Sequence, residues 1–329
     1  MVRPRASLHL VLLLIGGIVA LGAALCIGEV PVRVADLIGI LRGHHDSLSG
    51  TVVLQLRLPR ALAAFACGGL LAMAGALMQM LLRNPLADPY VLGVSGGAAL
   101  GALTAMLLGA VSVAVEASAF GGALIVMLLV FGLAHGDGSW TRTRLLLVGV
   151  VIASGCMAGI SLLLTLAPEQ QLPGMLFWLM GDISNAQHPG TALTVLLLAV
   201  IVTQVLARDF NLLARGEALA QSLGVATKSL RVIVFLLSSL LTAVAVSLVG
   251  SVGFIGLLVP HLVRMWLGND HRVLLPAVAL AGGVLLLAAD TAARSVLAPT
   301  QLPVGILTAL IGVPVFLFLL GRHSRGEGA

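Results

Sequence analysis

Long apolar runs, almost free of charged residues, recur along the whole chain and are separated by short segments that carry polar residues, prolines or glycines. A helix needs about 20 residues to cross the ~30 Å hydrocarbon core of a membrane, and most of these runs reach that length. The runs are continuous, whereas the strands of a membrane barrel alternate apolar and polar residues. We therefore predict an all-α polytopic membrane protein with about ten transmembrane helices, over residues 8–28, 61–82, 91–112, 114–134, 145–166, 191–207, 231–250, 255–267, 274–293 and 303–321.

The predicted span over residues 255–267 is too short to cross a membrane alone, and it contains Pro260. Proline cannot donate a helix hydrogen bond, so we expect this span to be bent or half-length. The longest polar segments, 29–60, 167–190 and 208–230, leave no room for a second soluble domain. Residues 1–329 are therefore interpreted as a single transmembrane domain.

The composition supports lipid as the medium around this chain. Hydrophobic residues make up 59% of it and charged residues 9%, with a mean hydropathy of +1.12. Soluble domains carry about 25% charged residues, because their whole surface is exposed to water. The 39 glycines favour a tightly packed bundle, since glycine lets neighbouring helix backbones approach closely in a membrane.

No residue pattern indicates catalysis or a resident metal. Cys26, Cys67 and Cys156 each lie in an apolar run without a partner at a useful spacing, and we interpret them as packing residues. The adjacent His44 and His45, with Asp46, could contact an ion, but neighbouring loop residues do not converge on one point. No H-E-x-x-H or comparable catalytic set occurs, and we predict neither a metal site nor a catalytic residue.

The basic residues are distributed unevenly between the two sides that the predicted spans define. With the N-terminus inside, most of the 18 Lys and Arg residues fall in inner loops, which favours cytoplasmic N- and C-termini. The first apolar run exceeds a signal-peptide core and no small-residue cleavage site follows, so we expect it to remain as a span. The basic residues on the outer side are Arg33, Arg42, Arg57, Arg60 and Arg294.

Two of these outer arginines, Arg57 and Arg60, stand three residues apart and would share a helix face. From the residues alone, they either reach lipid headgroups or form a docking patch for an acidic partner. Asp290 precedes Arg294 by four residues, and we expect the two to form an ion pair that holds the outer patch in place.

Four segments are unusual for lipid-facing sequence. They are Arg57-Leu-Pro-Arg60; Arg83-Asn-Pro-Leu-Ala-Asp-Pro89 with the glycine-rich stretch after it; the short amphipathic stretch within 208–231; and Gly250-Ser-Val-Gly-Phe-Ile-Gly-Leu-Leu-Val-Pro-His-Leu-Val-Arg264, followed later by Leu302-Pro-Val-Gly-Ile306. On these motifs the chain resembles the FecCD-type permeases, which import iron-siderophores, haem and cobalamin. The resemblance extends over residues 57–320.

The resemblance implies an architecture and a set of partners. It implies ten membrane helices per subunit, a homodimer with the path at its interface, two ABC ATPase subunits inside and a periplasmic or lipid-anchored binding protein outside. It implies binding-protein docking by Arg57, Arg60 and Arg294, and an inner gate at Asn84 and Leu86. It places ATPase coupling on Arg215, Gly216, Glu217, Ala218, Leu219, Ser222, Leu223 and Gly224. The loop before the fifth span offers Arg142-Thr143 where the family has small hydroxyl residues.

The energy source decides between two kinds of transporter. The chain has no G-x-x-x-x-G-K-[ST] loop, so we expect it to be no enzyme, to need no cofactor of its own and to rely on Mg-ATP bound by the partner ATPase. The alternative is an ion-gradient-driven secondary transporter that uses buried carboxylates, with Asp88, Glu116, Asp182 and Asp290 as candidates. The resemblance leaves the cargo open among siderophore, haem and cobalamin, with siderophore-iron as first choice. It implies a location in the bacterial cytoplasmic membrane and no nucleic acid partner.

Overall fold

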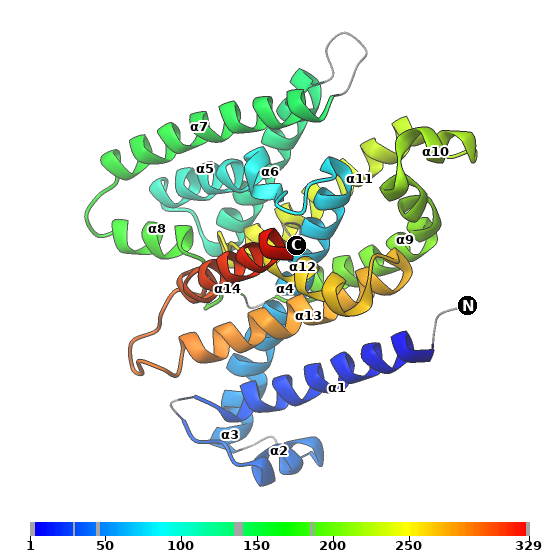
Figure 1. Cartoon of the computed structure of the whole chain (residues 1–329). Helices are drawn as coiled ribbons and strands as arrows, with labels where there is room; N and C mark the ends of the chain where they lie inside the picture. The colour runs from blue at the N-terminus through cyan, green and yellow to red at the C-terminus, as the bar shows by residue number, and fades with distance from the viewer. Residues whose placement is uncertain are drawn as a thin grey trace.

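The protein is described here from a computed structural model that covers residues 4–28, 30–43, 47–134, 141–184, 186 and 188–326. Over these residues it is a bundle of helices without a strand (Figure 1). The long helices are α1 (Pro4–Cys26), α4 (Leu58–Leu82), α5 (Val94–Leu107), α6 (Ser112–Ala134), α7 (Arg142–Leu166), α9 (Gly190–Arg215), α11 (Thr227–Val249), α12 (Ile255–Leu267), α13 (His271–Ala293) and α14 (Val304–Gly326). The short ones are α2 (Val34–Leu41), α3 (Leu48–Thr51), η1 (Val52–Arg57), η2 (Pro89–Leu92), α8 (Leu172–Leu179) and α10 (Glu217–Ser222).

Each of the ten predicted spans corresponds to one helix, which confirms the all-α polytopic prediction. In the described part of the chain, seven helices are long and apolar enough to cross a membrane, and α5, α12 and α14 supply shorter apolar stretches. The 13 residues of α12 confirm the half-length alternative for the span that contains Pro260. The expected span 91–112 is shortened to α5, because Gly93 takes a positive φ of 78° before it and Gly109 one of 71° after it.

The centre of the bundle is α4, which is buried at almost every position from Ala61 to Leu82. It packs against α13, α11, α12 and α9. A Cβ atom built on Gly68 would lie 2.3 Å from the carbonyl oxygen of Gly282, and one on Gly75 would lie 2.0 Å from that of Gly256. Only hydrogen fits at these positions, so the glycines bring backbone onto backbone as predicted for a membrane bundle.

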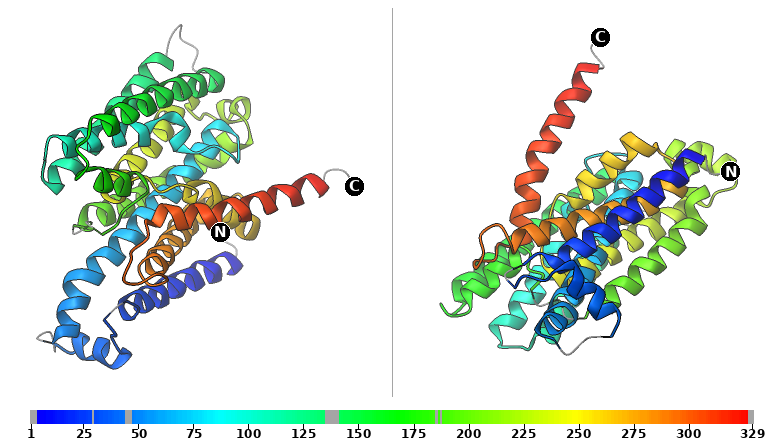
Figure 2. Two further views of the ribbon diagram at one scale, coloured as in Figure 1. Left: turned by 90° about the vertical axis from the view of Figure 1, so that its left-hand side faces the viewer. Right: turned by 90° about the horizontal axis from the view of Figure 1, so that it is seen from below.

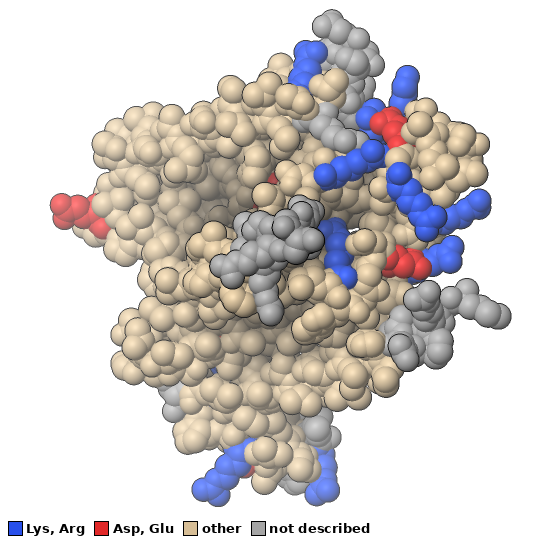
Figure 3. All heavy atoms as spheres, in the orientation of Figure 1, with Lys and Arg blue, Asp and Glu red and all other residues tan. Residues whose placement is uncertain are grey.

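The outer surface is apolar over its broad middle and charged at its ends. In Figure 3, Lys and Arg side chains gather at the end that carries α10 and the C-terminal part of α9. Large apolar side chains of the peripheral helices are exposed instead of packed, including Leu12, Ile18, Leu129, Val151 and Val205. Such a surface suits lipid. The three cysteines are free, and Cys67 and Cys156 are buried, in agreement with a packing role.

The last helix, α14, departs from the compact body of the bundle. In both views of Figure 2 it extends away from the other helices, which it contacts through α12 and α13. Its side chains Leu310, Ile311 and Leu317 are all more than half exposed. The chain therefore leaves an apolar helix face uncovered next to the bundle.

The close approach at Gly75 yields a stability prediction. Gly75→Ala should lower the stability of the folded protein by about 1–3 kcal/mol, because the new methyl group collides with the Gly256 backbone and the helices must separate. Thermal unfolding in detergent measures the effect. Gly132→Ala in α6 is the matched control, since a Cβ there meets nothing within 4 Å, and it should leave the melting temperature unchanged or slightly higher. Equal melting of both variants would contradict the packing described.

Candidate functional site

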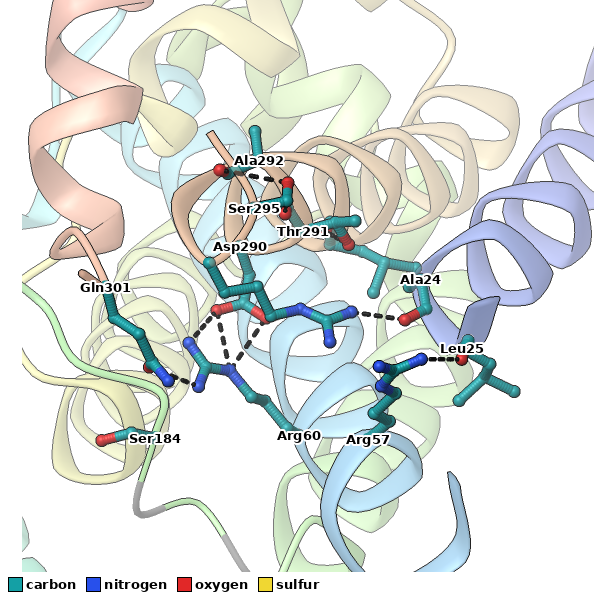
Figure 4. A network of polar contacts seen from close by, with 12 residues as sticks. Ala24, Leu25, Arg57, Arg60, Ser184, Asp290, Thr291, Ala292, Ser295 and Gln301 are labelled. Atoms are coloured by element: carbon teal, nitrogen blue, oxygen red, sulfur yellow. Dashed lines mark hydrogen bonds and ion pairs between the residues drawn. The ribbon is translucent and has the colours of Figure 1, made fainter. Parts of the chain in front are cut away.

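A cluster of three arginines lies where α4, α13 and the end of α1 meet, and two of them, Arg60 and Arg294, contact the carboxylate of Asp290 (Figure 4). Arg60 on α4 grips Asp290 on α13: its Nε lies 3.0 Å from both carboxylate oxygens and its Nη2 lies 2.8 Å from Oδ1. The Nη1 of Arg60 also donates to Gln301 Oε1 at 3.0 Å, in the connection that leads to α14. Asp290 is only 1% exposed, so this bidentate pair is a buried one and fastens two helices together.

Arg294 completes the cluster from the end of α13. Its Nε lies 3.8 Å from Asp290 Oδ2, which confirms the predicted i,i+4 pair, and its Nη2 donates to the carbonyl of Ala24 in α1. The stronger partner of Asp290 is nevertheless Arg60, 230 residues away in the sequence. With both arginines at its oxygens, Asp290 joins α13 to α4 and is already engaged as an ion-pair partner.

Arg57 has a different set of partners. Its guanidinium donates to the carbonyls of Leu25 at 2.7 Å, Cys26 at 3.0 Å and Val30 at 2.5 Å, and the residue is 6% exposed. The carbonyls of Leu25 and Cys26 end α1 and have no partner within that helix, so Arg57 closes its C-terminus. Arg57 is the last residue of the π-helical segment η1. Docking by Arg57, Arg60 and Arg294 stays a prediction. All three side chains also make contacts within the chain that stabilise the fold.

The predicted coupling segment forms a turn, a short helix and a stop at the basic end of the bundle. Gly216, at φ 145°, ends α9, and α10 follows until Gly224, at φ 82°, turns the chain towards α11. Glu217 pairs with Arg231 at 3.2 Å, which ties α10 to α11. Leu219 and Leu223 remain 45% and 54% exposed. The apolar face predicted for this helix thus points away from the protein.

The predicted gate residues lie on the loop after α4. This loop begins at Arg83, which takes a left-handed conformation with φ 49° and donates to the carbonyl of Leu213 at 3.1 Å. Asn84 Oδ1 accepts the backbone N–H of Leu86 at 2.9 Å, and both residues are exposed. Asp88 Oδ1 accepts the N–H of Tyr90 at 2.8 Å and caps η2. The loop is therefore held by its own side chains, and its gating role remains a prediction.

A polar pocket of about 750 Å³ joins the gate loop to the coupling segment. Its lining includes Asn84 and Arg215 from the two predicted sites, together with Gln79, Arg83, Asn211, Arg264, Asp270 and His271. Asn211 organises one wall: its amide nitrogen donates to Asp270 at 2.7 Å and its oxygen lies 2.8 Å from His271 Nδ1. Burial opposes ionisation of Asp270, but the hydrogen bonds from Asn211 and the Arg272 N–H leave its pKa below the ordinary value.

Sequence reasoning did not single out this pocket. The one signal in the sequence is the polar run Asn269-Asp270-His271-Arg272 between two apolar spans, and such a run is typical of an ordinary loop. Its contact with Asn211, 60 residues away, appears only in the structure. Among the residues that the structure describes, no group of three or more His, Cys, Asp or Glu residues could hold a metal ion. His44, His45 and Asp46 lie outside the described residues.

Comparison with known proteins places these features in context. The FecCD transport family matches residues 12–322, a longer stretch than the motifs alone covered. The hemin transport system permease protein HmuU of Yersinia pestis is 41% identical over 334 residues, covering 98% of each chain. The cobalamin import system permease protein BtuC of Halobacterium salinarum is 43% identical over 272 residues, covering 82% of this chain and 73% of that protein. A solved chain described as a metal-chelate type ABC transporter in an inward-facing conformation matches with TM-score 0.85 and 33% identity, over 95% of this chain and 98% of its own.

The Arg60–Asp290 pair can be tested by a double-mutant cycle. Asp290→Asn should destabilise the protein by about 3–5 kcal/mol, because buried guanidinium groups lose their counter-charge. Arg60→Gln should be comparably harmful, whereas the double variant should recover part of the loss. Thermal unfolding of the four proteins in detergent gives the coupling. Strictly additive effects would show that the two side chains do not depend on each other.

Proposed function

The chain belongs to the FecCD transport family, and from this premise we propose that it is the permease subunit of an ATP-driven importer that carries a metal chelate across the cytoplasmic membrane. The observation that carries the proposal is the arrangement of the ten long helices, which an inward-facing ABC transporter of metal-chelate type shares over 95% of this chain. An iron-siderophore, haem or cobalamin fits this class of cargo. The relatives named for hemin and cobalamin support the class without choosing among its members.

Two ATPase subunits supply the energy through α10. The helix offers exposed Leu219, and exposed Leu223 follows directly after the helix, at an otherwise basic end; such apolar side chains are the kind of anchor that fills a groove on a partner. Force on α10 passes through the Glu217–Arg231 pair to α11 and through Gly216 to α9. Mg-ATP binds to the partner, because this chain lacks a phosphate-binding loop.

A second copy of the chain covers α14. The exposed apolar face of this helix, beside the compact bundle in Figure 2, is suited to a homodimer whose interface contains the path for the cargo. The N- and C-termini are cytoplasmic in this arrangement, and the arginine cluster faces a binding protein outside. Arg60 and Arg294 share the single buried carboxylate of Asp290 and Arg57 adds a third positive charge nearby, so the cluster carries a positive excess that steers an acidic partner more than it holds it.

Reconstitution into proteoliposomes tests the function directly. With the ATPase partner and Mg-ATP at the α10 side, the loaded binding protein outside should drive uptake of its chelate, measured as radiolabelled metal retained in the vesicles. Ferric siderophore, haem and cobalamin are offered in turn. A proton or sodium gradient without ATPase should give no uptake above the empty-vesicle level. Uptake under a gradient alone would support the secondary-transport alternative instead.

Coupling through α10 gives a sharper prediction. Leu223→Ser should weaken binding of the ATPase at least about 10-fold, since an exposed apolar anchor is lost from the interface while the bundle is untouched. Co-purification and surface binding with purified ATPase measure this, alongside melting in detergent. Leu48→Ser removes a leucine that is also exposed but precedes η1 at the other end, and it should leave ATPase binding unchanged. A variant at Leu223 that binds and imports normally would remove α10 from the proposed interface.

A further inference from the structure

Tyr90 is the sole tyrosine of the chain, and its hydroxyl makes two hydrogen bonds to one distant residue. It donates to the carbonyl of Val252 at 2.9 Å and accepts the N–H of Val252 at 3.0 Å. Val252 is 1% exposed and lies in the non-helical segment between α11 and α12. A phenol that satisfies both backbone groups of a buried residue replaces the partners that a helix would otherwise supply.

On its own side, Tyr90 is fixed to the gate loop. Its N–H donates to Asp88, which is buried, and Tyr90 lies within η2 four residues beyond Leu86. η2 also packs on α7 and α5, so the tyrosine cannot swing independently of the loop that carries Asn84 and Leu86. A displacement of this loop therefore displaces the hydroxyl.

On the other side, the segment that contains Val252 is bonded to the connections of α8 and α14. Asp182 N–H donates to the Val249 carbonyl at 2.9 Å, and Val304 N–H donates to the Gly181 carbonyl at 3.0 Å. Gly305 N–H donates to the Met180 carbonyl at 3.1 Å. The end of α8, the segment 249–254 and the start of α14 thus form one hydrogen-bonded unit, which includes the base of the proposed dimer helix.

The same segment holds a strained backbone position. Phe254 has φ 69°, a left-handed conformation that is unfavourable for a bulky aromatic residue. Its side chain packs against α14, where a Cβ atom on Gly312 would come within 2.7 Å of Phe254 Cβ. A non-glycine residue held in this conformation marks a position that the surrounding structure constrains, and such positions concentrate at functional switches.

We propose that the Tyr90 hydroxyl is a latch that couples the inner gate loop to the unit formed by α8, segment 249–254 and α14. While both hydrogen bonds to Val252 persist, the gate loop and this unit move together, so the two ends of the path do not open independently. Tyr90 is a positioning residue in this account and does not contact cargo. The inference rests on the proposed transport function and adds a regulatory contact to it.

Tyr90→Phe removes the hydroxyl and retains the ring, which makes it the decisive variant. In proteoliposomes with ATPase and binding protein, it should lower the number of cargo molecules imported per ATP hydrolysed at least five-fold, while ATP hydrolysis persists. Thr242→Val is the matched control, because it removes a buried hydroxyl that bonds only within α11, to the carbonyl of Ser238. The control should retain the wild-type ratio. An unchanged ratio in a folded Tyr90→Phe variant would overturn the latch.

A spectroscopic readout separates a latch from a purely structural hydrogen bond. Wild type grown with 3-fluorotyrosine carries one ¹⁹F label in this chain, and its resonance should shift when the ATPase-bound complex is trapped with ATP and vanadate. A resonance that stays unmoved through the cycle would contradict the proposal even if Tyr90→Phe impairs folding. Uptake by the wild type in the same vesicles tests the proposed function itself. No import by the wild type would therefore contradict the transport function, whereas normal import by the wild type with an unchanged ratio in the variant would contradict only the latch.

Discussion

A backbone polar group left without a partner in hydrocarbon costs several kcal/mol, and this constraint explains why the irregular parts of the bundle are its most specific parts. Helices satisfy themselves, but this chain breaks them at the end of α1, after α4 and between α11 and α12. At each break a side chain or a neighbouring segment supplies the missing bonds. Arg57 takes the carbonyls that end α1, and Tyr90 takes both groups of Val252. The motifs that stand out in the sequence largely contain the residues that make these hydrogen bonds.

Around the repaired breaks, the glycine contacts of α4 set the geometry. Gly68 against Gly282 and Gly75 against Gly256 hold α13 and α12 at backbone distance from the central helix. Helices held at backbone distance cannot move apart gradually without losing these contacts. We therefore expect motion where the packing between elements is looser. Such places are α14, which extends from the bundle, α10, whose leucines are exposed, and the gate loop at its polar pocket. The small residues are concentrated at the centre, and the exposed elements lie outside it.

Much of this could be predicted from sequence, because the strongest signals are local. Continuous apolar runs gave the ten helices, Pro260 marked the half-length one, and the four-residue spacing indicated the Asp290–Arg294 pair. Contacts between distant segments carry no such signal. Arg60 meets Asp290 across 230 residues and Tyr90 meets Val252 across 162, and neither pairing has a periodicity. The eight residues by which α9 extends past the expected span were missed for another reason: helix continues into polar sequence once it has left the apolar layer.

The use of charge bears on how the protein is driven. Few charges are available, and in the described residues the buried carboxylates are already engaged: Asp290 by two arginines, and Asp88 by the N–H of Tyr90. A proton relay requires a carboxylate that can be released from its partners during the cycle, and releasing Asp290 would open the α4–α13 contact at the centre of the bundle. A mechanical input at the surface needs no such rupture. The element available for it is α10, tied to α9 by a glycine turn and to α11 by an ion pair, with its apolar side uncovered. The arrangement of the charges thus favours force from an attached ATPase over protonation inside the membrane.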